Sequence, residues 1–176
     1  VAMEPPVAAD STSIRNEMVK VFQSLRPINS NEVAQYVIRG QYTASHIKGV
    51  PQIGYRDEEG VSPTSETETF VAMKCFVDNW RWSGVPFYIR TGKRLPTRVT
   101  EVVIHFKENP HRIFSHNKAI ESDRNQLIIR IQPDEGLMLK FGMKVPGSGF
   151  RVERVNMDFR YSSLSDNHIP DAYERL

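Results

Sequence analysis

Apolar residues recur at every second position over much of the chain, and this two-residue period constrains the fold more than any other feature. In residues 100–107, Val102, Ile104 and Phe106 alternate with more polar neighbours. The last such run has its apolar positions at Val155, Met157, Phe159 and Tyr161. Successive side chains of a strand point to opposite faces of a sheet, so each run predicts a half-buried β-strand.

The other predicted elements complete an α+β pattern. Residues 10–26 have an apolar stripe at helical spacing, which predicts one amphipathic helix capped by Ser13 or by Asp10, Ser11 or Thr12 and ended by Pro27. Further strands are predicted at residues 33–39, 66–78, 85–90, 126–132 and 137–143. One helix and about seven strands, several joined by short turns, predict a large mixed, mainly antiparallel β-sheet with helices packed on one face. We expect residues 1–176 to form a single domain.

Composition excludes several classes of protein. The formal net charge is +2 and no long basic run occurs, so nucleic-acid binding is not expected. No stretch approaches the roughly 20 apolar residues that span a bilayer, and the first residues do not resemble a signal peptide. Cys75 is the only cysteine and lies in an apolar run, which predicts a small core residue in a reducing compartment, the cytoplasm.

The sequence contains no complete catalytic centre of a common type. No glycine-rich dinucleotide or triphosphate loop is present, and no familiar metal-binding motif occurs. His111 and His116 are the closest histidine pair, but they are five residues apart in a loop-like context. We therefore expect two solvated histidines there, and no metal site.

The polar residues that could bind a ligand are cations and amides at strand ends. Residues 90–94 read Arg-Thr-Gly-Lys-Arg, and Arg98 adds a guanidinium nearby. A glycine lets the backbone approach a ligand, and adjacent cations can bind a phosphate or order hydroxyls. Arg130 and Gln132 alternate with isoleucines and therefore should share one face of a strand. A solvated basic turn and structural polar partners are the alternative interpretations of these two groups.

Seven short sequence motifs, called words below, resemble glucose-6-phosphate dehydrogenases in their order, and the resemblance covers essentially the whole chain. They are Val-Ala-Met-Glu-Pro-Pro at 1–6, Arg-Gly-Gln-Tyr at 39–42, Asp-Asn-Trp-Arg-Trp at 78–82, Gly-Val-Pro-Phe at 84–87, Arg-Thr-Gly-Lys at 90–93, Gln-Leu-Ile-Ile-Arg-Ile-Gln-Pro at 126–133 and Pro-Asp-Ala-Tyr-Glu-Arg-Leu at 170–176. The resemblance implies the substrate-binding and dimerisation domain of an enzyme that oxidises glucose 6-phosphate to 6-phosphogluconolactone with NADP, in the oxidative pentose phosphate pathway. It also implies a homo-oligomer, a dimer or a tetramer.

The resemblance divides the site between this chain and the rest of such an enzyme. The family's catalytic histidine and coenzyme-binding Rossmann domain precede the Val-Ala-Met-Glu-Pro word, so we expect this chain to be truncated at both ends and inactive alone. No catalytic residue is assigned to it. By position in the matching words, Lys93 and Gln132 are expected to contact the sugar end of the substrate, with Arg98 in the same region. A choice between NADP and NAD does not follow from these residues.

The resemblance also raises the question of a second, structural NADP, which some members of the family bind on the sheet. The positions used there match Arg90, Arg130, Lys140 and Asp158. Val99 and Val103 stand where those members carry basic residues. The loss of two charge-assisted contacts, each worth about 1.5–3 kcal/mol, argues against this second site.

Two readings of a different class remain open on the residues alone. One is a non-catalytic oligomerisation or interaction module, in which the basic turn is incidental. The other is an anion- or nucleotide-binding module that depends on residues 90–94 and Arg98.

Overall fold

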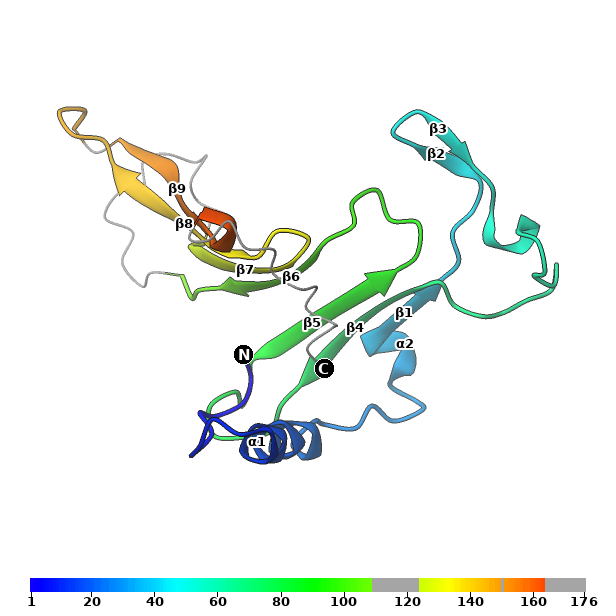
Figure 1. Cartoon of the computed structure of the whole chain (residues 1–176), viewed down its shortest axis with the longest axis horizontal. Helices are drawn as coiled ribbons and strands as arrows, with labels where there is room; N and C mark the ends of the chain where they lie inside the picture. The colour runs from blue at the N-terminus through cyan, green and yellow to red at the C-terminus, as the bar shows by residue number, and fades with distance from the viewer. Residues whose placement is uncertain (109–123, 150, 164–176) are drawn as a thin grey trace. The chain divides into compact units, whose positions relative to one another are not determined.

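In the computed structural model, residues 1–108, 124–149 and 151–163 are described, and strands outnumber helices in them (Figure 1). The chain divides into two compact units, Val1–Pro96 and Thr97–Leu176, and each is described by itself. The prediction of a single domain over residues 1–176 therefore stays a prediction.

The first unit begins with helix α1, Ser11–Gln23. The Asp10 carboxylate caps it, because it accepts hydrogen bonds from the backbone N–H groups of Thr12 and Ser13, each at 2.9 Å. The helix ends before Pro27, earlier than predicted. The reason is that the next residues pair with the end of a strand: Leu25 forms an isolated β-bridge with Val77.

A three-stranded antiparallel sheet forms the centre of this unit, in the order β1-β4-β5. Its strands are β1 Val37–Gly40, β4 Phe70–Phe76 and β5 Pro86–Gly92. Cys75, on the central strand β4, is 8 % exposed, and burial raises the pKa of its thiol, so the prediction of a core cysteine is confirmed. Val77, just beyond β4, is 2 % exposed.

The predicted strand at residues 33–39 is wrong in its first half. Val33–Tyr36 form a short helix, α2, and β1 begins only at Val37. Asn29 donates hydrogen bonds from its backbone N–H and its side-chain amide to the Glu32 carboxylate, at 3.1 and 2.7 Å. This local turn favours helical geometry at once after Glu32, whereas the apolar spacing of the sequence is compatible with either element.

The polar segment between β1 and β4 contains structure that the sequence pattern did not predict. A two-stranded hairpin is formed by β2, Ser45–Ile47, and β3, Val50–Gln52, and a 3-10 helix, η1, follows at Tyr55–Asp57. These strands are too short and too polar for the two-residue period to indicate them.

The second unit is a four-stranded antiparallel sheet in the order β6-β7-β8-β9. Its strands are β6 Thr100–His105, β7 Gln126–Gln132, β8 Gly136–Lys144 and β9 Val152–Arg160, followed by a 3-10 helix, η3, at Tyr161–Ser163. All four strands were predicted, with bounds within a few residues. Ile128, on β7, is 8 % exposed.

The α+β class with mainly antiparallel pairing is confirmed, and every strand pair in the described residues is antiparallel. The described strands are distributed over three sheets, in place of the one large sheet that was expected. Among the helices of these residues, none is long and apolar enough to cross a membrane.

Candidate functional site

The densest group of predicted site residues lies in the turn that follows β5. Its backbone is held close to the start of β4: the N–H of Lys93 donates to the carbonyl oxygen of Thr69 at 2.8 Å. Gly92 makes this approach possible, because a Cβ at this position would lie 2.9 Å from Cδ2 of Phe70. The turn is therefore packed directly against the sheet.

Arg94 is paired and does not extend freely into solvent. Its Nη2 lies 2.8 Å from Glu58 Oε1, and its Nη1 donates to Gln52 Oε1 at 2.9 Å. Its backbone adopts the left-handed region, with φ of 54°. A residue other than glycine rarely adopts this conformation unless its surroundings hold it there. Both partners come from the segment between β1 and β4, so Arg94 ties that segment to the turn.

Tyr42 completes this cluster from the other side. Its hydroxyl donates to Glu58 Oε1 at 2.7 Å, and its ring meets that of Tyr55 edge-on at a centroid distance of 5.8 Å. The hydrogen bond from Tyr42 and the bond from Arg94 hold the pKa of Glu58 below its ordinary value. The same contact with Glu58 raises the pKa of the Tyr42 phenol. Glu58 is thus a carboxylate shared by two donors.

Lys93 differs from its neighbour. Its side chain is exposed and makes no ion pair or hydrogen bond with another residue that the structure describes. A cation on a backbone fixed in this way can orient the hydroxyls or the phosphate of a bound molecule without first giving up a protein partner. Arg90, on β5, is also exposed and pairs in register with Ala72 of β4.

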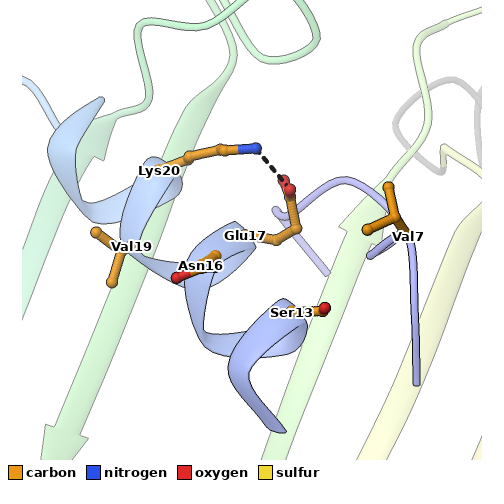
Figure 2. A pocket seen from close by; sticks show the side chains of 6 residues that line it. All are labelled: Val7, Ser13, Asn16, Glu17, Val19 and Lys20. Atoms are coloured by element: carbon orange, nitrogen blue, oxygen red, sulfur yellow. Dashed lines mark hydrogen bonds and ion pairs between the residues drawn. The ribbon is translucent and has the colours of Figure 1, made fainter. Parts of the chain in front are cut away.

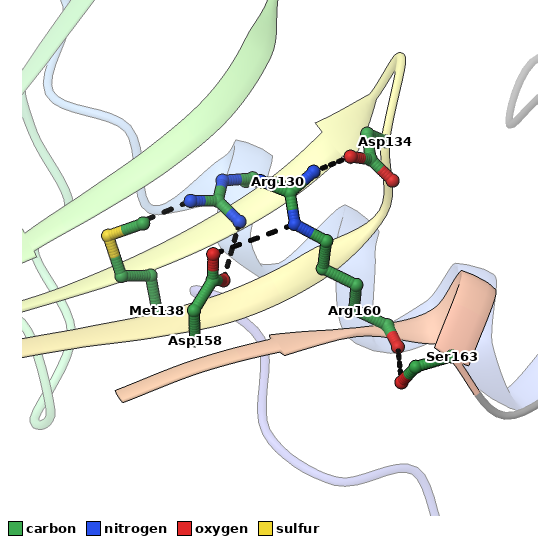
Figure 3. A network of polar contacts seen from close by, with 6 residues as sticks. All are labelled: Arg130, Asp134, Met138, Asp158, Arg160 and Ser163. Atoms are coloured by element: carbon green, nitrogen blue, oxygen red, sulfur yellow. Dashed lines mark hydrogen bonds and ion pairs between the residues drawn. The ribbon is translucent and has the colours of Figure 1, made fainter. Parts of the chain in front are cut away.

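In the second unit the structure brings two of the predicted residues, Arg130 and Asp158, together. Arg130 Nη1 donates to Asp158 Oδ1 at 2.7 Å, and Figure 3 shows the two side chains meeting across β8. Arg130 Nη2 lies 3.7 Å from the sulfur of Met138. Only 16 % of the Arg130 side chain is exposed. A half-buried pair of this kind neutralises the cation that a phosphate would need.

A second arginine joins the same cluster. Arg160 Nε lies 3.5 Å from Asp158 Oδ2, and its Nη1 pairs with the Asp134 carboxylate (Figure 3). The Arg160 carbonyl oxygen accepts a hydrogen bond from the Ser163 hydroxyl at 2.6 Å. The two arginines and the two aspartates therefore balance one another in charge.

The remaining predicted residues lie near strand ends or on the sheet of the second unit. Arg98 is exposed and precedes β6, and Gln132 is half-buried and pairs with Thr100. The register shifts between Thr100 and Glu101, which interrupts the alternation that predicted Arg130 and Gln132 on one face. Lys140 pairs in register with Gln126 and with Asn156. Lys93 and Arg90 belong to the first unit, and the others belong to the second.

Sequence reasoning missed the role of Glu58. It belongs to the acidic cluster at residues 57–59, which the sequence predicted to be a solvated loop tip. The structure corrects this for Glu58, whose side chain is 28 % exposed and binds Arg94 and Tyr42. No signal in the sequence could have found this role, because an acidic loop carries no period that reports the partners of its residues.

Two other kinds of site are alternatives to the turn among the residues that the structure describes, a metal site and a surface hollow. The described residues hold no group of three His, Cys, Asp or Glu side chains that could bind a metal ion, while His111 and His116 lie outside them. A hollow of about 440 Å³ lies beside α1 (Figure 2). Its lining is Val7, Ser13, Asn16, Glu17, Val19 and Lys20. Its one cation, Lys20, pairs with Glu17 at 2.6 Å, and no predicted site residue reaches it.

Comparison with known proteins gives one consistent result. The family described as "Glucose-6-phosphate dehydrogenase, C-terminal domain" matches residues 1–176. The chain is 53 % identical over 176 residues to a glucose-6-phosphate 1-dehydrogenase of Aggregatibacter actinomycetemcomitans, covering 100 % of this chain and 35 % of the relative. It is 52 % identical over 177 residues to that of Treponema pallidum, covering 100 % and 34 %. The chain thus spans about a third of the length of these relatives.

Two solved structures are similar as well. One is a glucose-6-phosphate dehydrogenase in complex with its substrate glucose-6-phosphate, with a TM-score of 0.81 and 36 % identity over 98 % of this chain and 34 % of that one. The other, a glucose-6-phosphate 1-dehydrogenase from Mycobacterium avium, has a TM-score of 0.74 and 34 % identity over 91 % of this chain and 31 % of that one.

Proposed function

Because the chain belongs to the glucose-6-phosphate dehydrogenase C-terminal domain family, we propose that it is part of a longer oxidoreductase acting on glucose 6-phosphate. The product would be 6-phosphogluconolactone and the electron acceptor NADP, as in the oxidative pentose phosphate pathway. The chain supplies part of the substrate site, and it is inactive without the rest of the enzyme. The observation that carries the proposal is the exposed Lys93 cation on a turn whose backbone is bonded to Thr69 and whose next side chain, Arg94, is bonded to Gln52.

In this proposal Lys93 binds and orients the hexose. The oxidation removes a proton from the C1 hydroxyl and a hydride from C1, and NADP, when bound, accepts the hydride. Lys93 moves neither of them: its ammonium donates hydrogen bonds to the substrate and so limits its orientations at the reacting carbon. From their positions in the matching words alone, Gln132, an amide donor, and Arg98, a cation, are proposed as further substrate contacts.

The proposal places the coenzyme on parts of the enzyme outside this chain. The described residues fit a second, structural NADP poorly, because the Arg130 guanidinium is already bound by Asp158. A phosphate would have to displace that carboxylate before it could use the cation. No step is therefore assigned to a coenzyme on this sheet, and Arg90 and Lys140 are left as sheet-surface cations.

A homo-oligomer, a dimer or tetramer, forms part of the proposal. Side chains of β8 and β9 that alternate onto one face are apolar and exposed: Leu137, Met143, Met157 and Phe159, with exposed fractions of 39, 45, 62 and 38 %. Contiguous apolar surface of this kind favours association with another protein surface. A cytoplasmic location is proposed because the lone cysteine has no disulfide partner in the sequence.

The test is a kinetic assay on the longer protein that contains this chain. Reduction of NADP, and separately of NAD, is followed in the presence of glucose 6-phosphate for the wild type and for Lys93→Ala. We expect kcat/KM to fall by about 100-fold or more in the variant, because a misplaced substrate loses reactive geometry. Lys107→Ala removes a similarly exposed lysine and is the matched control.

Two results would contradict the proposal at different points. Unchanged kcat/KM for Lys93→Ala would remove Lys93 from the site while leaving the activity in place. Failure of the folded wild-type protein to oxidise glucose 6-phosphate with either coenzyme would remove the activity itself, and would leave a non-catalytic oligomerisation module as the better interpretation.

A further inference from the structure

The turn that carries Lys93 is held from three directions. Thr69 is one anchor: its carbonyl oxygen accepts from the N–H of Lys93 at 2.8 Å, and its hydroxyl accepts from the N–H of Tyr42 at 3.0 Å. Packing of Gly92 on Phe70 is the second. The side chain of Arg94 is the third, since it reaches Glu58 and Gln52 in the neighbouring segment.

The third anchor differs from the other two because its residue is in an unfavourable backbone conformation. The left-handed region costs a residue other than glycine about 1–2 kcal/mol, so the conformation of Arg94 needs compensation. Its guanidinium provides this through hydrogen bonds to two separate acceptors. If these bonds were lost, Arg94 could relax, and the peptide bond that joins it to Lys93 would turn with it.

The charge on Arg94 is paired within the protein, although its side chain is 47 % exposed. Glu58 neutralises it at 2.8 Å, and the Tyr42 hydroxyl holds the same carboxylate oxygen in place at 2.7 Å. Lys93, the preceding residue, has no such partner among the residues that the structure describes. Two adjacent cations therefore have different tasks, since one is used within the protein and the other is left for a ligand.

We propose that Arg94 is a positioning residue for Lys93, and that its pairing with Glu58 and Gln52 fixes the direction in which Lys93 presents its ammonium to the substrate. This inference rests on the proposed function, because it presupposes that Lys93 binds the hexose phosphate. Arg94 itself does not touch the substrate. Glu58, 36 residues earlier in the chain, then influences the substrate site through Arg94 without contacting the substrate.

The test uses steady-state kinetics of the longer protein in a double-mutant cycle. Arg94→Ala and Glu58→Ala are each expected to raise KM for glucose 6-phosphate by about 10-fold, with a smaller change in kcat. Because both substitutions remove the same ion pair, the KM of the double variant should be no higher than that of either single variant. In a Lys93→Ala background neither substitution should change KM further, since there is then no ammonium to position.

A matched control separates positioning from stability. Arg26 and Asp78 form a two-bond ion pair in the same unit, at 2.9 and 2.7 Å, with side chains 52 and 45 % exposed. Arg26→Ala removes a comparable pair and should leave KM unchanged. Glu58→Gln keeps an acceptor for Arg94 and Tyr42 and should give an intermediate KM; it serves as the variant to use if Glu58→Ala does not fold. Thermal unfolding is followed for every variant.

Three outcomes overturn the inference. If Arg94→Ala and Glu58→Ala lower Tm but leave KM within about twofold, the pair is only structural. If Arg94→Ala raises KM and Glu58→Ala does not, Arg94 contacts the substrate directly. In both cases the proposed function stands. If Lys93→Ala leaves kcat/KM unchanged, the proposed site fails first and the positioning role fails with it.

Discussion

The turn after β5 and the sheet cluster around Arg130 both contain an arginine bound to a carboxylate, but they leave different charges behind. In the turn, Glu58 neutralises Arg94, and the adjacent Lys93 has no ion-pair partner among the described residues. In the sheet, Asp158 binds Arg130 and lies 3.5 Å from Arg160, which also pairs with Asp134. Every cation of that cluster has a carboxylate.

This difference shows why a count of positive residues is a poor guide to an anion site. Both regions contain at least two cations, and both include part of a word that resembles the family. An anionic ligand gains most from a cation that the protein has not already paired with a carboxylate. By this criterion the turn is suited to a phosphorylated sugar, and the Arg130 cluster is suited to holding three strands of its sheet together.

The largest expected effect concerns how each region is held. Gly136→Ala would place a Cβ against the backbone carbonyl oxygen of Phe159 on the adjacent strand. Gly92→Ala would bring its Cβ closest to the ring edge of Phe70, at 2.9 Å, with Leu95 Cγ and the Thr69 carbonyl oxygen at 3.4 Å. We expect Gly136→Ala to lower the free energy of unfolding by about 1–3 kcal/mol and Gly92→Ala to cost less, because a side chain moves more easily than a paired strand.

Chemical denaturation of the longer protein measures both variants. Gly40→Ala, where an added Cβ would meet no atom within 4 Å, is the control. Equal losses for Gly136→Ala and Gly92→Ala would contradict the expectation that a clash with a paired strand costs more than a clash with the ring of Phe70.

A smaller effect is expected from the ion pair of the sheet. Arg130→Ala leaves Asp158, whose side chain is 34 % exposed, without its closest partner, so we expect a loss of about 1–2 kcal/mol in the free energy of unfolding. Arg151→Ala breaks a pair with Glu153 whose side chains are 61 and 51 % exposed, and it should cost about 0–1 kcal/mol. If the two variants lose the same stability by denaturation, the Arg130 pair is a surface pair like any other.

The smallest effect is a pH dependence that belongs to the turn. The pKa of Glu58 is held below its ordinary value of 4.5, so its contribution to stability is complete above that value and is lost as the pH falls through the folded-state pKa. Glu58→Gln removes this titration. Tm should therefore fall less in the variant than in the wild type between about pH 5 and pH 3. Parallel curves would show that Glu58 gains nothing from Arg94 and Tyr42.

The sheet of the second unit was predictable because its strands obey a strict two-residue period. Residues 126–132 were predicted as a strand with the bounds that β7 has. The same period failed at Val33, where hydrogen bonds from Asn29 to Glu32 hold a turn just before the helix, because apolar spacing does not report such local side-chain contacts.

The candidate site was predictable only in part. Lys93 and its turn follow from the glycine and the adjacent cations, but the partner of Arg94 does not. Glu58 lies 36 residues away across a loop and a short hairpin, and no pattern in the sequence relates the two positions. The pairing of Arg130 with Asp158 is equally non-local, because it depends on the register of β8 between them.

Calorimetric titration of the longer protein with glucose 6-phosphate tests the contrast between the two regions most directly. Lys93→Ala and Arg130→Ala each remove one cation, the first without a protein partner among the described residues and the second bound to Asp158. The account predicts that Kd rises at least about 10-fold for Lys93→Ala and stays within about twofold of the wild type for Arg130→Ala. A raised Kd for Arg130→Ala together with an unchanged Kd for Lys93→Ala would contradict this prediction.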